Sequence, residues 1–101
     1  RIAVLGDMLE LGKDSARYHR ELKSYLDGVD GVVCVGTHMR ALDACLDRRS
    51  RLRYFEQAGQ ALIDYLLSAT RSGDVILVKG SRGVFWSQGF VASLTEAFKA
   101  A

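Results

Sequence analysis

Short apolar runs alternate along the chain with longer segments in which apolar residues recur at helical spacing. Uninterrupted runs occupy residues 2–5, 32–35 and 75–78, and a weaker run at 52–55 alternates apolar residues with arginine. An uninterrupted run is typical of a parallel strand buried on both faces, whereas the arginine-containing run suits an edge strand. The pattern predicts an α/β fold in which four strands alternate with helices.

A helix is expected after each strand. The first begins at Asp14 or Ser15, the second follows a cap at Gly36 and Thr37, and the third runs over about 57–69. The positions expected to face the sheet are Tyr18, Leu22, Tyr25 and Leu26 in the first helix, Met39, Leu42, Cys45 and Leu46 in the second, Ala58, Ala61, Leu62, Tyr65 and Leu66 in the third, and Phe90, Val91, Leu94, Ala97 and Phe98 in the last. Gly89 indicates either close packing or a late start of the last helix. These elements define a Rossmann-like, open, mainly parallel sheet with helices on both faces.

The composition is that of one ordinary domain. The 101 residues are 49% hydrophobic and 26% charged, with a formal net charge of +2, and a chain of this length supports one hydrophobic core. No apolar run approaches the ~20 residues that span a bilayer, and residues 1–6 do not have the features of a signal peptide. We therefore expect a cytoplasmic protein that does not bind membranes.

Charge and cysteine usage do not indicate nucleic-acid binding or a disulfide scaffold. The basic cluster at 48–53 has no interleaved aromatic residues to stack on bases, so we interpret it as a solvated loop. Cys34 and Cys45 do not have the spacing of a metal motif or a secreted scaffold, and we expect free, buried thiols. We expect no metal site, because His19 and His38 have no second ligand spaced near them.

Chemistry-bearing residues follow the strands, where ligands of an open parallel sheet bind. Asp7 and Glu10 lie between glycines after the first strand, Thr37 and His38 follow the second, and residues 79–83 read Lys-Gly-Ser-Arg-Gly. Two cations, a hydroxyl and the backbone N–H groups of a helix start suit an anion. The structural alternative is that the carboxylate only caps a helix and that the glycines only permit tight turns.

Two common nucleotide-binding motifs are excluded. The first loop is not the dinucleotide fingerprint G-x-G-x-x-G, because five residues that include no glycine separate Gly6 from Gly12. In Lys79-Gly80-Ser81 the lysine precedes the glycine, whereas a Walker A loop places glycine before lysine. We therefore do not expect this chain to cradle a triphosphate by itself.

Two segments carry a resemblance to a known family. Residues 2–12, Ile-Ala-Val-Leu-Gly-Asp-Met-Leu-Glu-Leu-Gly, are followed by His19, and residues 75–83 read Val-Ile-Leu-Val-Lys-Gly-Ser-Arg-Gly. Together they strongly resemble the C-terminal domain of the Mur ligases, over essentially the whole chain. The two motifs are specific and the helices between them are generic. Within the family, the closest resemblance is to the ligases that add D-alanyl-D-alanine.

The resemblance implies an ATP-dependent amide ligation in the bacterial cytoplasm that builds the peptidoglycan precursor. ATP phosphorylates the carboxylate of UDP-N-acetylmuramoyl-tripeptide, and the amine of D-alanyl-D-alanine then attacks the acyl phosphate. In that family a central domain holds the P-loop and Mg²⁺, and an N-terminal domain holds the UDP-sugar. The C-terminal domain closes over the site, brings in the amine substrate and touches the nucleoside of ATP, so it acts by positioning and by excluding water.

The resemblance also implies roles for individual residues. Asp7 matches the position that contacts the ribose of ATP. The loop that receives the amine substrate is matched by Lys79, Gly80, Ser81 and Arg82. Arg82 is suited to hold the free carboxylate of the dipeptide at two points. Glu10, Gly12 and His19 fit the motif without an assigned role, and the resemblance places no catalytic residue in this chain.

The chain also departs from the family pattern. The upstream stretch of the family's domain and its P-loop domain are missing, so 1–101 is expected to be an N-terminally truncated C-terminal domain that packs against the central domain of its own chain. We expect this domain to be inactive alone and its first strand to expose an unpaired edge. After Gly83 the family usually has a sequence of the Met-Glu type, and residues 84–88 differ from it. The resemblance places this stretch in the wall of the dipeptide pocket.

Two alternatives remain open. The first is another Mur-type amide ligase, such as the one that adds the third residue of the muramyl peptide. Its loop is expected to read Lys-Gly-His-Glu, against which Ser81 and Arg82 argue. The second alternative is a flavodoxin-like nucleotide or protein binding module.

Overall fold

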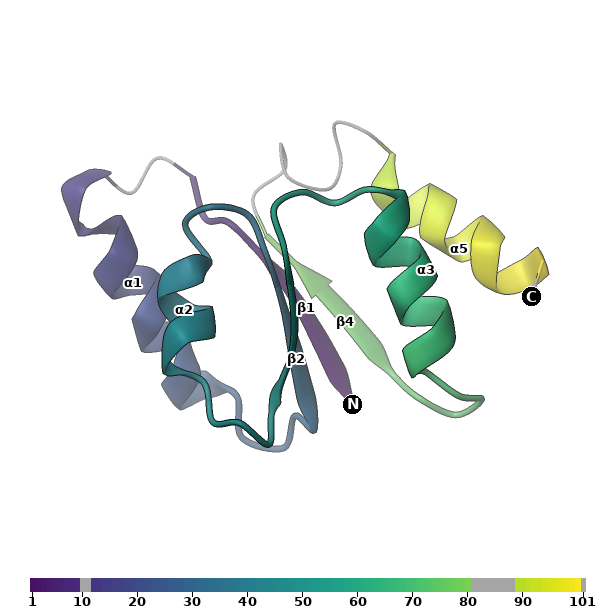
Figure 1. The fold of residues 1–101 in the computed structure, drawn as a ribbon, viewed down its shortest axis with the longest axis horizontal. Coiled ribbons are helices and arrows are strands. Elements are labelled where there is room, and N and C mark those ends of the chain that lie inside the picture. Colours follow the sequence, from purple (N-terminus) through teal and green to yellow (C-terminus); the bar gives the residue numbers. More distant parts are fainter. Residues whose placement is uncertain (10–11, 81–88, 101) are drawn as a thin grey trace.

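The four described strands form a parallel sheet. The computed structural model describes residues 1–9, 12–80 and 89–100. The strands are β1 (Ile2–Gly6), β2 (Gly31–Val35), β3 (Arg51–Phe55) and β4 (Ile76–Lys79), in the order β3-β2-β1-β4 (Figure 1). All three strand pairs are parallel, which confirms the predicted architecture.

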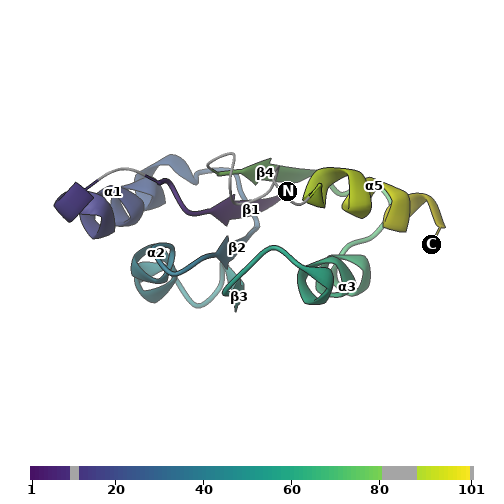
Figure 2. The ribbon, with the colours of Figure 1, turned by 90° about the horizontal axis from the view of Figure 1, so that it is seen from above.

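Helices cover both faces of the sheet, as predicted. The helices α1 (Ser15–Glu21) and α2 (Arg40–Cys45) lie on one side, and α3 (Gln60–Ala69) and α5 (Phe90–Ala100) lie on the other (Figure 2). Short 3₁₀ helices, Gly12–Asp14 and Leu22–Tyr25, precede and follow α1. The chain is therefore a three-layer α/β structure with strands at its centre.

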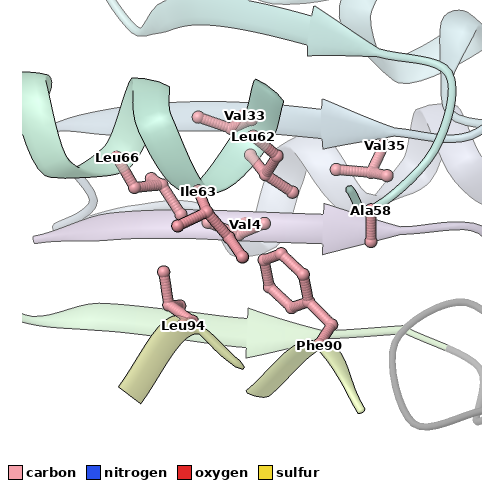
Figure 3. Packing of buried hydrophobic residues seen from close by; sticks show 9 residues of the cluster. All are labelled: Val4, Val33, Val35, Ala58, Leu62, Ile63, Leu66, Phe90 and Leu94. Carbon is pink, nitrogen blue, oxygen red and sulfur yellow. The ribbon is translucent and has the colours of Figure 1, made fainter. Parts of the chain in front are cut away.

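Alternate residues of the strands supply two separate cores. Toward α3 and α5, the buried members are Val4, Val33, Val35, Ala58, Leu62, Ile63, Leu66, Phe90 and Leu94 (Figure 3). Toward α1 and α2, the buried members are Ala3, Leu5, Val32, Cys34, Met39 and Leu42. Because β1 and β2 are buried on both faces, their sequences contain no polar alternation.

The edges of the sheet differ from one expectation. β1 does not present an unpaired edge, because it lies between β2 and β4 and pairs with both. The prediction was wrong because the crossover through α3 brings β4 to the far side of β1. The edge strands of the described sheet are β3, as predicted, and β4. The uninterrupted apolar run of β4 does not mean burial on both faces, because Leu77 is 51% exposed at this edge. The exposed arginines of β3 discourage this edge from pairing with another sheet, because charged side chains on an edge strand oppose such pairing.

The predicted inner face of the first helix was wrong at its two tyrosines. Tyr18 is 40% and Tyr25 is 80% exposed, whereas His19 is fully buried. The α-helix ends at Glu21 and continues as a 3₁₀ turn, which advances about 120° per residue instead of about 100°. The regular spacing from which Tyr25 was predicted therefore does not persist along this segment, whereas Tyr18 lies in α1 itself, whose buried positions are Ser15 and His19.

Two further predictions of inner positions were wrong, at Ala61 and Phe98, whose side chains are exposed. Ile63 is buried in place of Ala61, because α3 begins at Gln60 rather than near residue 57 and directs Leu62, Ile63 and Leu66 at the sheet. Gly89 has φ +64° and open space around its α-carbon, and α5 begins at the next residue. The late-start interpretation of Gly89 is therefore confirmed.

The two cysteines are free, as expected. Cys34 is fully buried in β2, and this burial, with a smaller contribution from nearby Asp43, raises the pKa of its thiol to about 12. The predicted burial of Cys45 was wrong, because this thiol is only half-buried at the end of α2, where it donates to the carbonyl of Leu42. A buried thiol with a raised pKa is unreactive, so Cys34 acts as a small core residue.

Candidate functional site at the carboxyl edge of the sheet

The strand register brings the candidate residues to one edge. Leu5 of β1 is paired with Cys34 of β2 on one side and with Lys79 of β4 on the other. Asp7 and Thr37 follow directly beyond the paired ends of β1 and β2. The prediction that Asp7, Thr37 and Lys79 share the carboxyl edge is therefore confirmed.

Asp7 is a buried carboxylate that ties β1 to α2. Its side chain accepts the backbone N–H of Met39 with a 2.8 Å distance from Oδ1, and its own backbone N–H donates to the carbonyl of Val35 at 3.1 Å. The residue is only 7% exposed. The carboxylate thus satisfies a donor at the start of α2, where negative charge is favoured by the helix dipole.

Gly36 makes room for this carboxylate. A Cβ at Gly36 would lie 2.4 Å from the Asp7 carboxylate, and the residue has φ +107°. Both the close approach and the positive φ require glycine. The sequence predicted a helix cap at Gly36 and Thr37, but Met39 occupies the N-cap position and no side-chain hydrogen bond is made from it. The hydrogen bond at the start of α2 is supplied by Asp7 from the loop after β1, which sequence spacing does not reveal.

Lys79 and Gly80 lie beside an apolar cavity of about 420 Å³ at the same edge. The cavity walls are Leu5, Gly6, Met8, Leu22, Tyr25, Leu26, Met39, Lys79 and Gly80. Lys79 is exposed, and among the described residues no carboxylate forms an ion pair with it. The edge therefore combines an available cation with an apolar recess.

His19 lies at this edge in a polar cluster under the first loop. Its Nε2 accepts the backbone N–H of Met8 at 2.9 Å, and its Nδ1 lies 2.6 Å from the carbonyl oxygen of Ser15. The Ser15 hydroxyl is 3.3 Å from Nδ1 of His19 and 3.3 Å from Nδ1 of His38. The two imidazole rings stack with centroids 5.7 Å apart. The sequence left His19 without a role and did not connect it with Ser15 or His38.

Several motif residues fall outside this description. Glu10, Ser81 and Arg82 lie outside the described residues, so their predicted roles remain predictions. Gly12 is exposed, has φ +70° and begins the 3₁₀ helix before α1. Its place is that of a turn residue which lets the first loop enter the helix.

A larger pocket, of about 820 Å³, lies at the opposite end of the sheet. It is bordered by Leu67 and Thr70 at the end of α3, by Asp74 and Ile76 around the start of β4, and by Phe98 of α5. This pocket is remote from Asp7 and Lys79. We take the carboxyl edge as the site, because ligands of parallel sheets bind there.

The described part of the chain holds neither a metal-binding cluster nor a membrane-spanning helix. Residues 1–9, 12–80 and 89–100 contain no group of three His, Cys, Asp or Glu side chains placed to hold a metal ion. In the same ranges no helix has the length and apolar character needed to cross a bilayer.

Comparison with known proteins places this chain in a family. The family model described as Mur ligase, glutamate ligase domain, matches residues 1–82. The chain therefore belongs to the Mur ligase family, and the resemblance predicted from the two motifs is confirmed.

Two similar proteins are ligases, one named for the joining of D-alanyl-D-alanine and the other named MurF. The chain is 33% identical over 86 residues to the UDP-N-acetylmuramoyl-tripeptide–D-alanyl-D-alanine ligase of Rickettsia prowazekii (strain Madrid E), across 83% of this chain and 19% of that protein. It superposes on the crystal structure of the MurF ligase of Thermotoga maritima in complex with ADP, with a TM-score of 0.74 and 26% identity, covering 99% of this chain and 23% of that one. The chain thus spans about a fifth of the length of these relatives.

Proposed function

We propose that this chain is the C-terminal, amine-substrate and nucleoside-contacting domain of an ATP-dependent ligase that joins D-alanyl-D-alanine to UDP-N-acetylmuramoyl-tripeptide in the bacterial cytoplasm. The observation that carries the proposal is the carboxyl edge, where Asp7 and Lys79 lie together within a match to the Mur ligase family. The two relatives, one named for this reaction and one holding ADP, support the same branch of the family.

Asp7 is the proposed contact of the ATP ribose. A carboxylate that accepts hydrogen bonds from the ribose hydroxyls suits this role, and it must be held in one orientation to select the ribose. The hydrogen bond from Met39 to Oδ1 provides that orientation, and Gly36 leaves space around the carboxyl group. The same contact is also a helix cap, so Asp7 has a structural and a proposed binding role, and the two need separate readouts.

Lys79 and Gly80, with Ser81 and Arg82, are the proposed site for the amine substrate. The dipeptide carries a free carboxylate, for which a lysine and the planar guanidinium of arginine are suitable partners. The apolar cavity beside Lys79 is of a kind that suits methyl groups such as those of alanine side chains. This arrangement would orient the attacking amine without taking part in bond making.

The remaining steps of the reaction belong to the rest of the proposed ligase. The chain has no Walker A sequence, and Mg²⁺ is proposed to be held by the central P-loop domain together with the phosphates of ATP. In this proposal, ATP phosphorylates the tripeptide carboxylate, the dipeptide amine attacks the acyl phosphate, and phosphate leaves as the amide forms. The present chain contributes by packing against the central domain and closing the site, so alone it should form no product.

A paired substitution in the intact ligase tests the assignment. Arg82→Lys should raise the KM for D-alanyl-D-alanine by roughly ten- to a hundredfold, because lysine keeps the charge but loses the two-point grip worth ~1.5–3 kcal/mol. Asp7→Asn should raise the KM for ATP with little effect on the dipeptide. Steady-state kinetics on the same samples, with the melting temperature, separate binding from stability.

The structural alternative predicts a different outcome. If Arg82 only pairs within its own loop and Asp7 only caps α2, each substitution lowers the melting temperature and changes both KM values together. Unchanged dipeptide kinetics in a stably folded Arg82→Lys ligase would mean that this arginine is not the carboxylate anchor. A preference for a free diamino acid over the dipeptide would instead favour the other Mur-type ligase.

A further inference from the structure

The fully buried His19 is the strongest unexplained feature of the proposed site. Histidine is an amphipathic side chain that is seldom fully buried without polar partners. Here the ring is 0% exposed and contacts the first loop through Met8 and its own helix through Ser15. It is therefore a hydrogen-bonded bridge between the loop after β1 and helix α1.

The hydrogen-bond partners assign the tautomer of this imidazole. Nε2 accepts from the backbone N–H of Met8, so Nε2 carries no proton. The carbonyl oxygen of Ser15 only accepts, so Nδ1, at 2.6 Å from it, carries the proton and donates. The ring is thus a neutral imidazole that joins one backbone donor to one backbone acceptor.

The bridged loop position is the one that matters for the proposed ATP contact. Met8 directly follows Asp7, and the Asp7 carboxylate is already held on the other side by the N–H of Met39. Asp7 therefore lies between two fixed points, with α2 holding its side chain and His19 holding the backbone beyond it. Without the His19 acceptor, the N–H of Met8 would lose its partner, and the chain after Asp7 would be free to rotate.

We propose that His19 is a positioning residue for the ATP-ribose contact, which it serves by fixing through Met8 the direction in which the chain leaves Asp7. The proposal rests on the function proposed above for Asp7. His19 touches no substrate in this scheme. Ser15 and the stacked His38 close the other side of the ring, because the Ser15 hydroxyl lies within reach of Nδ1 of both histidines.

The decisive variants are made in the intact ligase. His19→Leu fills the space but removes the acceptor, and His19→Gln places an amide oxygen where it can accept the N–H of Met8. Leu66→Ala, on the opposite face of the sheet, is the matched control for a loss of stability, since Leu66 is equally buried and belongs to the core under α3 and α5. Asp7→Asn is made in parallel.

Two readouts are compared for each variant, the KM for ATP and the amide hydrogen exchange of the segment 6–9 by mass spectrometry. His19→Leu should raise the KM for ATP about fivefold to tenfold, the size of one hydrogen bond, and leave the KM for the amine substrate within about twofold. The segment 6–9 should exchange faster while β2 stays protected. His19→Gln should restore both properties, and Leu66→Ala should lower the melting temperature without raising the KM for ATP.

The outcomes separate this proposal from the one on which it rests. If Asp7→Asn raises the KM for ATP but His19→Leu does not, the positioning role is refuted. If amide hydrogen exchange in segment 6–9 increases only together with exchange in β2, His19 merely fills the core and the proposal fails. The proposal also fails if His19→Gln restores neither the KM for ATP nor the slow exchange of 6–9. If Asp7→Asn leaves the KM for ATP unchanged, the ribose contact itself is refuted, whereas faster exchange confined to 6–9 would still support the fixing of the loop by His19.

Discussion

The two sides of the sheet are built on different principles. Toward α3 and α5, the buried side chains of the described residues are all apolar and come from the sheet, both helices and the loop before α3. Toward α1 and α2, the described part of the chain buries four polar residues, Asp7, Ser15, His19 and Asp43, beside a smaller apolar cluster. Apolar contacts are non-directional, whereas hydrogen bonds fix orientation. Both apolar clusters therefore stabilise the fold, and the polar contacts of the second side also place the carboxyl-edge loops.

Asp43 shows that this contrast extends beyond the site. It lies on α2, its side chain is 10% exposed, and it pairs with Arg51 of β3 at 3.1 Å. Like Asp7, it fixes α2 against a strand. The helix has only six residues, too few for a stable isolated helix, so its position depends on these polar contacts and on Met39 and Leu42.

The largest expected effect tests whether the two sides of the sheet, which both carry stability, differ in their influence on the carboxyl edge. Leu62→Ala should reduce the free energy of unfolding by ~2–5 kcal/mol, because Leu62 is fully buried in the apolar core. Leu42→Ala, its equally buried counterpart on α2, should cost a similar amount. Urea denaturation of the 101-residue chain measures both. In the intact ligase, only Leu42→Ala should also raise the KM for ATP, and equal kinetics for the two variants would remove the contrast.

A smaller loss of stability is expected on the α1–α2 side, where the position of Asp7 depends on one glycine. Gly36→Ala should destabilise by about 1–3 kcal/mol, because alanine at φ +107° is strained and its Cβ meets the Asp7 carboxylate. The control is Gly59→Ala, since Gly59 has ordinary extended φ and no atom lies within 4 Å of the place that an alanine methyl group would take. Thermal denaturation of both variants gives the comparison. A Gly36→Ala protein as stable as Gly59→Ala would show that Asp7 is not closely held.

The smallest expected effect is a change in the pH dependence of stability, and it probes the apolar part of the α1–α2 side. The pKa of the Cys34 thiol is raised from 9.0 to about 12 by burial, so the unfolded chain loses this proton first. Stability from this group is complete below pH 9 and is lost between pH 9 and about 12, at about 1.4 kcal/mol per pH unit. Cys34→Ala should flatten the fall in urea midpoint between about pH 8.5 and about pH 10, the part of this range nearest the unfolded pKa. An equally steep fall in both proteins would contradict the assignment.

The apolar pattern was enough to predict the elements and their layers. Val32 to Val35 is buried on both faces because the run has no polar residue, and β3 is an edge strand because arginine alternates along it. The pattern failed at β4, an edge strand whose Leu77 is 51% exposed although its run has no polar residue before Lys79, and it failed where local helix geometry changed. Tyr25 was predicted inside because a continuous α-helix was assumed, whereas Leu22–Tyr25 is a 3₁₀ helix. Tyr18 lies in α1 itself, whose buried positions are Ser15 and His19.

By itself, the sequence determined the α/β class, the parallel sheet, the two motif loops and the family to which they belong, because these follow from hydrophobic periodicity and from residues close together in the chain. Only the tertiary structure decided that Asp7 accepts the N–H of Met39 at the start of α2 and that the absence of a side chain at Gly36 makes room for the Asp7 carboxylate. It also decided that His19 accepts the N–H of Met8. Asp7 and Met39 are 32 positions apart, and Met8 and His19 are 11 apart. Such contacts depend on how strands and helices cross over the sheet, and hydrogen bonds require distances and angles that no residue spacing specifies.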